Sequence, residues 1–508
     1  MTDSNKPVLQ VIARWLLGAQ LIYLGILKFS FVRRSPGPNY DSEFSQIYEA
    51  AGFFSQKIFG QHIPLPMLDP LRSFMQSLIF LLDERSLLRF RAWEFLLWAI
   101  AVGFSTWSIS RYCKKNFGTD GLLVFLFIAV FLQQGPVYPH VLMISGLFFL
   151  TFDLQKMRQS LGAVIICSVL AGLSRVNWFL FPGLMAVLLL CLDAIKDRRR
   201  ISAASLRLAV YWVVAGLTTS LATSIVYLRL THNPIPYLSS NFNYPFLPMR
   251  LLPNEIYSLG IFLGTGVVTF IGLLLLLQVT INKIKETTLA YLMIWAILIF
   301  LAGLGVIISM RIGGTFNLHN MDLFLLFLLV SIIALRQDFF RMSSISLSGA
   351  YKQAFLLLVI VPIIYTAVFA RGAKPTTFEY PDLEQLQTRI TVAERTGKPV
   401  LMINYRHLLV FGDLRVNELV TDYEKMVLME MSMARVKPYL KNFEEAMMEK
   451  DYSMVITTGR YYTHFEQKDN ILAPEENSWS DYVVLPMEIG YEAEPGEFGF
   501  WIWTPTGQ

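Results

Sequence analysis

The sequence predicts a mainly α-helical, polytopic membrane protein with about eleven transmembrane helices and a small C-terminal extracytoplasmic α/β domain. Three observations predict this fold class. Of the 508 residues, 54% are hydrophobic and only 16% are charged, whereas a soluble chain carries about 25% charged residues. The apolar residues fall into runs long enough to cross a bilayer. The charge is also divided unevenly along the chain. Together these features exclude a soluble enzyme, a disordered chain and a fibrous protein.

The charge division predicts two domains in different solvents. Residues 1–370 hold 29 basic and 16 acidic residues, a net charge of +13, and we assign them to a transmembrane domain. Residues 371–508 hold 14 basic and 22 acidic residues, a net charge of −8, and we assign them to a soluble domain. This negative charge argues against nucleic acid as a partner. The second range contains no cysteine, which excludes a disulfide framework or a thiolate zinc site there.

Apolar stretches of about 17–25 residues mark the candidate membrane spans. They lie at roughly 8–32, 90–112, 119–135, 137–153, 160–175, 176–192, 206–230, 257–281, 287–310, 321–336 and 354–370. The stretch 160–192 could instead be one long helix with a break near Ser174. Division into two spans is favoured because the loops rich in lysine and arginine then lie on the same side of the membrane before and after this stretch.

That distribution predicts the orientation of the chain. One set of alternate short loops holds 15 lysines and arginines, and the opposite set holds only Arg175, Arg250 and Arg311. By the positive-inside rule, the N-terminus is cytoplasmic and the C-terminal domain is extracytoplasmic, in the plasma (inner) membrane. The outer loop 33–89 contains two apolar helical patterns, at 44–59 and 71–82. Both are too short to cross a bilayer, so we expect helices that lie in the outer interface.

The segment Asp41-Ser42-Glu43 supplies two candidate functional carboxylates in this outer loop. Two carboxylates at this spacing can bind a divalent cation, or one can act as a general base while the other orients it. The simpler alternative is that Asp41 caps the N-terminus of the helix that follows.

Three segments give the chain a resemblance to a known family. They are the acidic outer loop NYDSEFSQIYEAAGFF at 39–54, the segment Ser174–Phe179 before Pro182, and the segment Asn317–Asp322. With the span number, the sidedness and the final outer domain, they make residues 1–370 similar to the C-type (GT-C) superfamily of integral-membrane glycosyltransferases. The nearest clan in this resemblance is that of the protein O-mannosyltransferases and aminoarabinose transferases.

Two departures from the family pattern stand out. Protein O-mannosyltransferases carry adjacent acids in this loop, whereas Ser42 separates them here, which weakens the role of Glu43 more than that of Asp41. The C-terminal domain is also unlike the β-trefoil insertion of the eukaryotic enzymes, so a protein acceptor is not implied.

The resemblance implies a hexosyl or pentosyl transferase that uses a polyprenyl-phosphate-linked sugar. The acceptor is a glycan, lipid or protein of the cell envelope. Asp41 is the implied general base, with Glu43 as the second catalytic candidate, and the sugar is transferred with inversion at its anomeric carbon. Family members that use monophosphate lipid donors often need no divalent metal, so none is required here, although one is compatible with the two acids.

Arg175 and Arg311 lie at outer ends of spans, where a guanidinium can bind the phosphate of the lipid donor. Asn177, His319 and Asn320 are the candidate substrate-binding residues. Each assignment has a structural alternative. Arg175 can bond carbonyl groups at a helix break, Arg311 can mark a helix end, and His319 and Asn320 can cap the following helix. Glu94, inside the second span, is expected to pair with Arg91 or Arg14.

The pattern changes in the C-terminal domain. Residues 382–396 and 423–450 have helical spacing, whereas 399–403, 453–457, 482–485 and 498–503 are typical of strands. The order strand, helix, strand predicts a small α/β domain with some parallel pairing.

Other functions remain open at this stage. A transporter or flippase for lipid-linked or envelope glycans is the main alternative, although no internal repeat supports it. A lipid-linked oligosaccharide ligase would rely on arginine and histidine and would not need Asp41. A non-catalytic assembly subunit is a further alternative.

Overall fold

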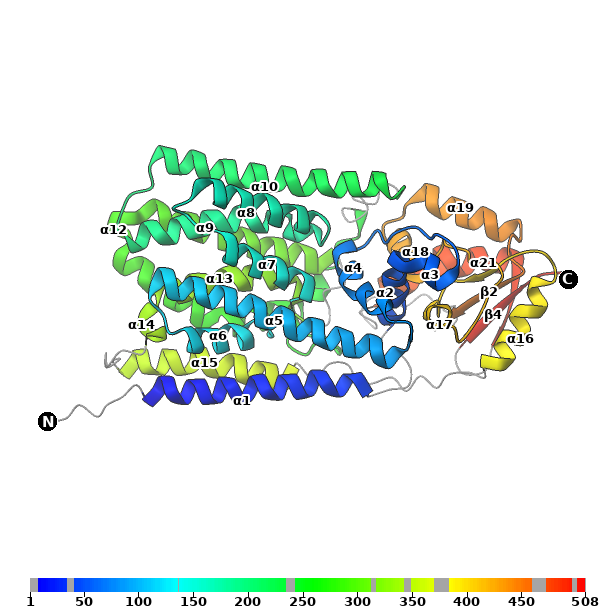
Figure 1. Cartoon of the computed structure of the whole chain (residues 1–508), viewed down its shortest axis with the longest axis horizontal. Helices are drawn as coiled ribbons and strands as arrows, with labels where there is room; N and C mark the ends of the chain where they lie inside the picture. The colour runs from blue at the N-terminus through cyan, green and yellow to red at the C-terminus, as the bar shows by residue number, and fades with distance from the viewer. Residues whose placement is uncertain are drawn as a thin grey trace. The chain divides into compact units, whose positions relative to one another are not determined.

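The computed structural model describes residues 8–33, 41–135, 137–233, 243–311, 317–341, 349–369, 383–458, 472–495 and 500–507. The chain forms two compact units (Figure 1). The first unit comprises Met1–Lys28, Leu96–Tyr227 and Pro248–Gly372, and the second comprises Phe29–Phe95, Leu228–Leu247 and Ala373–Gln508. The loop 33–89 and residues 228–247 therefore belong to the same unit as the C-terminal residues.

The regular elements of the first unit are all helices in its described residues. Its elements are α1 (Val8–Ser30), α5 (Leu87–Phe117), α6 (Gly121–Phe131), α7 (Pro139–Thr151), α8 (Met157–Gly172), η4 (Val176–Leu180), α9 (Phe181–Lys196), α10 (Ala203–Leu230), η5 (Pro248–Leu251), α12 (Gly260–Arg311), η6 (His319–Met321), α13 (Asp322–Leu335), α14 (Gln337–Phe340) and α15 (Gly349–Phe369). The first residues of α5 and the last residues of α1 and α10 belong to the second unit.

Six helices in the described part of the chain are long and apolar enough to cross a membrane. They are Val8–Arg33, Val176–Lys196, Ala203–Leu230, Gly260–Asn282, Thr287–Arg311 and Gly349–Phe369. Four further apolar helices, Gly121–Phe131, Pro139–Thr151, Met157–Gly172 and His319–Leu335, have only 10–17 residues. The mainly helical, polytopic architecture is confirmed, while the number of eleven spans stays a prediction.

The stretch 160–192 forms two helices. The chain leaves α8 after Gly172, and α8 and α9 then pack against each other, so the chain turns back between them. Two glycines allow α10 to approach this pair closely, because a Cβ atom at Gly172 would lie 2.4 Å from the Ser220 carbonyl oxygen and one at Gly183 would lie 2.8 Å from that of Trp212. Small residues at helix contacts are typical of membrane-embedded packing.

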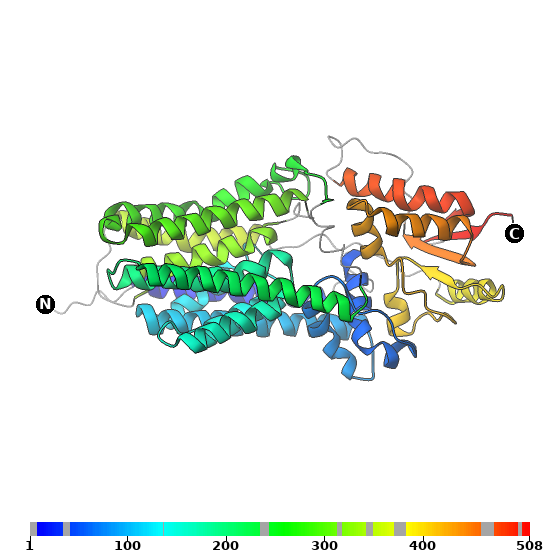
Figure 2. The same ribbon diagram turned by 90° about the horizontal axis from the view of Figure 1, so that it is seen from above.

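Two further contacts order the first unit. α12 is a pair of helices joined at Thr287, whose backbone is non-helical, and the two halves fold back on each other (Figure 2). Across this turn Trp295 Nε1 donates to Thr280 Oγ1 at 3.1 Å. α1 and α15 lie side by side (Figure 1), and Gln20 Nε2 of α1 donates to Thr366 Oγ1 of α15 at 2.8 Å.

The second unit combines short helices with a sheet. Its elements are η1 (Phe31–Arg33), α2 (Asp41–Ala51), η2 (Gly52–Phe54), α3 (Ser55–Phe59), α4 (Pro70–Ser77), η3 (Leu78–Leu81), α16 (Leu383–Glu394), β1 (Val400–Met402), α17 (His407–Phe411), α18 (Lys425–Met433), α19 (Lys437–Met448), β2 (Met454–Thr458), α20 (Ala473–Trp479), η7 (Ser480–Val484), α21 (Leu485–Gly490), β3 (Tyr491–Pro495) and β4 (Phe500–Pro505).

The four strands form one mixed sheet in the order β1-β2-β4-β3. β1 and β2 are parallel, with Leu401 opposite Val455, and the other two pairings are antiparallel. The predicted α/β domain with some parallel pairing is thus confirmed.

Alternate strand residues point to opposite faces of this sheet, as the strand period of two requires. Leu401, Val455 and Trp503 pack with residues of α18, α19, α20, η7 and α21. Val400, Met402, Met454, Ile456 and Ile502 pack with residues of α16 and α17 and with Phe44 of α2. Figure 2 shows the orange and red helices on one side of the strands and the yellow helices on the other. The sheet is therefore covered on both faces.

One prediction for this unit is wrong, and another is refined. The predicted strand 482–485 is helical, because Val483 and Val484 fill the core from η7 and Pro486 lies in the first turn of α21. The strand in this part of the chain is β3, which follows α21. The helical pattern 423–450 is confirmed, but it is divided into α18 and α19 because Arg435 adopts a left-handed backbone with φ of 51°.

Candidate functional site

The chain break between α8 and α9 presents a row of polar side chains. Arg175 has an extended backbone, and the 3₁₀ turn η4 starts directly after it. Ser174 Oγ bonds back to the Leu170 carbonyl oxygen at 2.9 Å, which satisfies one acceptor at the end of α8. The break therefore turns Arg175, Asn177 and Trp178 toward other parts of the first unit.

The segment before α13 is the second component. Asn317 Oδ1 accepts from the His319 backbone N–H at 2.9 Å and lies 2.8 Å from His319 Nδ1, which fixes the turn that leads into η6. Two glycines allow other parts of the chain to pack closely against this segment. A Cβ atom at Gly135 would lie 2.8 Å from the Leu318 carbonyl oxygen, and one at Gly305 would lie 2.8 Å from that of Asn320. Close packing therefore holds the segment in place.

Asp322 joins the two components. Its carboxylate is fully buried and accepts from Trp178 Nε1 at 2.7 Å, from Asn177 Nδ2 at 3.4 Å and from the Leu323 backbone N–H at 2.7 Å. Arg175 Nη1 lies 3.6 Å from Asp322 Oδ2, and Arg175 Nη2 donates to Asn320 Oδ1 at 2.7 Å. We call Arg175, Asn177, Trp178, Asn320 and Asp322 the arginine cluster.

Aromatic rings extend the arginine cluster. The guanidinium carbon of Arg175 lies 5.1 Å from the centre of the Tyr138 ring, within the range of a cation–π contact. The Tyr138 ring also lies 5.9 Å from the ring of His140 and 6.1 Å from that of His319. Two histidines and an arginine thus surround one tyrosine.

The guanidinium of Arg175 is only partly hydrogen-bonded in the arginine cluster, and its Nη1 atom is buried. Its side chain is 13% exposed, and within the described residues Nη1 makes no hydrogen bond. A guanidinium has five N–H donors in a rigid fork. With one nitrogen fixed by Asn320 and the charge balanced by Asp322, the remaining N–H groups can bind an anion such as phosphate.

The structure brings Arg175, Asn177 and Asn320 together. His319 contacts the ring of Tyr138, which in turn contacts Arg175. Asn177 and Asn320 are buried and bonded within the cluster, so they orient the charged groups. Arg311 is partly buried and is the last residue of α12, where this described range stops.

The other two predicted residues belong to the second unit. Asp41 begins α2, but its side chain lies outside the described residues. Glu43 is 1% exposed, and both its oxygens are bound by Arg91, with Nε to Oε1 at 2.7 Å and Nη2 to Oε2 at 3.1 Å. This bidentate ion pair fixes the start of α2 to the start of α5.

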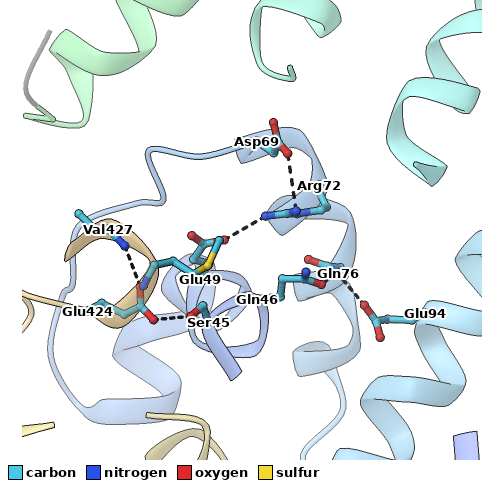
Figure 3. A network of polar contacts seen from close by, with 10 residues as sticks. Ser45, Gln46, Glu49, Asp69, Arg72, Gln76, Glu94, Glu424 and Val427 are labelled. Carbon is cyan, nitrogen blue, oxygen red and sulfur yellow. Dashed lines mark hydrogen bonds and ion pairs between the residues drawn. The ribbon is translucent and has the colours of Figure 1, made fainter. Parts of the chain in front are cut away.

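Polar contacts continue along α2 (Figure 3). Glu49 Oε2 lies 3.3 Å from Arg72 Nη2, and Arg72 Nη1 also lies 3.6 Å from Asp69 Oδ2. Burial raises the pKa of Glu49 to about 8, and Glu424 and Asp69 add to this against the opposing charge of Arg72. We call the contacts that α2 makes with α4 and with the C-terminal residues the α2 network.

Glu94 has a different partner from those predicted. Its Oε1 accepts from Gln76 Nε2 at 2.8 Å (Figure 3). Arg91 is committed to Glu43, and Arg14 forms an ion pair with Asp120 at 2.6 Å. The predicted ion pairing of Glu94 is wrong because Gln76 of α4 supplies a neutral donor to the buried carboxylate.

Sequence reasoning missed Asp322, Trp178 and Tyr138 as members of a site. A signal for Asp322 was present, because an acidic residue at the start of an apolar helix is costly unless it is paired. Within the described part of the chain, no group of three or more histidine, cysteine, aspartate or glutamate residues could hold a metal ion.

Comparisons with known proteins add no family to these observations. No protein-family model matches the chain, and no curated protein matches it either.

Proposed function

We propose that the protein is a membrane glycosyltransferase that moves a sugar from a polyprenyl-phosphate donor to an acceptor hydroxyl on the extracytoplasmic face. In this proposal the chain crosses the plasma (inner) membrane eleven times, with its N-terminus in the cytoplasm and the second unit outside. A lipid-linked donor suits this location, because nucleotide sugars are not available there and the lipid tail stays in the bilayer.

One observation carries most of the support. Two of the three segments on which the family resemblance rests, Ser174–Phe179 and Asn317–Asp322, meet in the arginine cluster although they lie about 145 residues apart. A convergence of polar side chains around one arginine is the arrangement expected of a phosphate site.

The proposed reaction has one proton transfer and one displacement. Asp41 takes the proton of the acceptor hydroxyl, whose oxygen attacks the anomeric carbon of the donor sugar. The bond between that carbon and the phosphate oxygen breaks, and the configuration inverts. Polyprenyl phosphate leaves with the bonding electrons, and Arg175 and Arg311 stabilise the negative charge on its oxygen.

Other residues assist these groups in the proposal. Asp322 and Asn320 hold the guanidinium of Arg175, and His319 is assigned to binding of the sugar or the phosphate. Glu43, bound by Arg91, serves to fix the helix that starts with Asp41.

The test is sugar transfer by the full-length protein in proteoliposomes supplied with polyprenyl-phosphate sugars and an acceptor extract. Asp41→Asn should lower kcat by about 100- to 10,000-fold, the range for loss of a general base. Asp413→Asn, an acid elsewhere in the second unit, is the matched control and should leave kcat unchanged. Transfer that survives Asp41→Asn at the wild-type rate would end the assignment of the base. Absence of transfer from every lipid donor would favour a transporter or an assembly subunit.

A lipid-linked oligosaccharide ligase is a second candidate, favoured by the arginine and two histidines around Tyr138. The same assay separates the two functions. A ligase would retain activity in Asp41→Asn and lose it in Arg175→Gln and His319→Gln, whereas the proposed transferase would be impaired in Asp41→Asn first.

A further inference from the structure

The helix that begins with Asp41 is built into the hydrophobic core of the C-terminal residues. Phe44 is 5% exposed and belongs to the core on one face of the sheet, together with Met402, Ile456 and Ile502. Its ring lies 4.3 Å from the ring of His407, measured between centres. α2 therefore contributes a core residue to a domain whose strands begin more than 350 residues later in the sequence.

A hydrogen bond fixes the same turn of α2. Ser45 Oγ donates to Glu424 Oε1 at 2.5 Å, and both side chains are buried (Figure 3). Glu424 is the N-cap of α18, and its other oxygen accepts from the backbone N–H groups of Met426 and Val427 at 2.8 and 3.3 Å. One carboxylate thus starts α18 and binds α2.

A third contact lies one turn further along α2. Arg406 Nη1 donates to the Tyr48 hydroxyl at 3.0 Å and to the Thr421 carbonyl oxygen at 2.9 Å. Arg406 Nε donates to the Met402 carbonyl oxygen at 2.6 Å, and Nη2 donates to that of Asp422. This guanidinium ties α2 to the end of β1 and to the loop before α18.

The three contacts lie at positions i, i+1 and i+4 of one helix, so they hold one side of it. The backbone of Asp41 is one helical turn before Ser45, a rise of about 6 Å. Whatever fixes Phe44, Ser45 and Tyr48 therefore also fixes the backbone that carries the proposed base.

We propose that the C-terminal domain, residues 383–507, positions α2 for catalysis, with Glu424 and Arg406 as positioning residues for Asp41. This inference rests on the proposed function. It gives the domain a role in the reaction that does not require it to contact the reacting atoms. A ligand that moves α17 or α18 also moves the base, because Arg406 precedes α17 and Glu424 caps α18.

The first test measures docking without reference to activity. Hydrogen exchange of residues 44–51 is followed by mass spectrometry on the full-length protein in lipid nanodiscs. Ser45→Ala combined with Tyr48→Phe removes both polar contacts and keeps the helix-forming backbone, so exchange in this segment should accelerate about 10-fold or more. The control is Ser55→Ala combined with Tyr491→Phe, which changes two buried hydroxyls of the same unit that do not join α2 to the domain.

The second test measures catalysis by the same variants. Displacement of a catalytic group by about 1 Å can cost about 100-fold in rate. The double variant should therefore lower kcat about 10-fold or more while KM for the lipid donor stays within about two-fold, because the donor phosphate is assigned to the first unit. The control pair should leave both constants near the wild-type values.

The outcomes separate the inference from the proposed function. Faster exchange in α2 with an unchanged kcat, or unchanged exchange in the double variant, would overturn the positioning role while Asp41→Asn still abolished transfer. Full transfer in Asp41→Asn would overturn the proposed function, and with it any role of the domain in positioning a base.

Discussion

The two polar clusters of this protein differ in how their carboxylates are neutralised. In the arginine cluster, the carboxylate of Asp322 is surrounded by donors, namely the guanidinium of Arg175, an indole N–H and an amide. In the α2 network, Glu49 shares Arg72 with Asp69. Nearby in the sequence of α18 but outside that network, Glu430 is bonded by the Tyr244 hydroxyl. Burial raises the pKa of Glu430 to about 7, with Asp69 and Glu475 adding to it.

This difference in the partners of the carboxylates indicates how each cluster is held together. The ion pair and hydrogen bonds of Asp322 fix the side chains of Arg175, Asn177 and Trp178, so the arginine cluster is ordered around one guanidinium. Because their pKa values are raised to about 8 and about 7, Glu49 and Glu430 take up protons near neutral pH. The other contacts of the α2 network are the hydrogen bond between Ser45 and Glu424, the donors of Arg406 and apolar packing. Substitutions in the two clusters test this difference.

The largest effect is expected for Asp322→Asn. The change keeps the size of the side chain but removes the charge that balances Arg175 and one of the acceptors for Trp178 and Asn177. Loss of one partner from a buried ion pair costs about 3–5 kcal/mol. The apparent unfolding temperature of the detergent-solubilised protein should therefore fall, and binding of polyprenyl phosphate should weaken. Asp197→Asn, at a half-exposed acid, is the control, and an equal stability of both variants would contradict the role of Asp322.

Phe44→Ala should have the next largest effect, and in the second unit. Removal of a buried phenyl ring leaves a cavity in the sheet core, at a cost of about 3 kcal/mol. Hydrogen exchange should accelerate in α2 and in β1 and β2 together. Phe74→Ala, at a ring of α4 that is 46% exposed, should change the exchange of these strands little. Acceleration confined to α2 would show that Phe44 is not part of the sheet core.

A smaller effect is expected from the pH dependence of Glu49. The folded-state pKa of about 8 lies above the model-peptide value, so the folded state holds a proton that the unfolded chain has lost. Stability from this group is complete below pH 4.5 and declines as pH rises to about 8. The apparent unfolding temperature of the second unit should fall between pH 6.5 and 8, and Glu49→Gln should flatten that decline. An unchanged slope in Glu49→Gln would exclude Glu49 as its cause.

The sequence predicted the parts of this structure that depend on local pattern. The apolar stretches are helical because a bilayer-length apolar run can satisfy its backbone only within itself. β1 and β2 follow from short runs of buried residues between helical patterns. Arg175 was chosen because a guanidinium at the end of a span can bind phosphate, and Asn177 and Asn320 were chosen from the segments that carry the family resemblance. These three residues lie together.

The contacts that the sequence could not predict join distant segments. Ser45 and Glu424 are 379 residues apart, and nothing in the local pattern of either indicates the other. Asp322 was overlooked because its partners are an arginine and a tryptophan from a helix break about 145 residues earlier. The valines at 483 and 484 favour a strand locally, but packing of η7 and α21 against the sheet overrides that preference.

The smallest effect is expected on the acidic side of the pH profile, from His407. Burial lowers the pKa of this imidazole to about 3, so the folded state excludes a proton that the unfolded chain binds below about pH 6.5. Stability from this group is therefore complete above pH 6.5 and is lost as pH falls toward 3, opposite in sign to the effect of Glu49.

His407→Phe keeps a ring beside Phe44 and cannot titrate, so it should flatten the decline in unfolding temperature below pH 4.5, where Glu49 no longer contributes a slope. The wild-type protein should then show a stability maximum at about pH 5–6. Glu49→Gln should reduce the decline on the alkaline side, to which Glu430 also contributes, and His407→Phe should reduce the decline on the acidic side. If His407→Phe left the acidic limb unchanged, protonation of other groups would have to cause it, and the contact between Phe44 and His407 would be independent of pH.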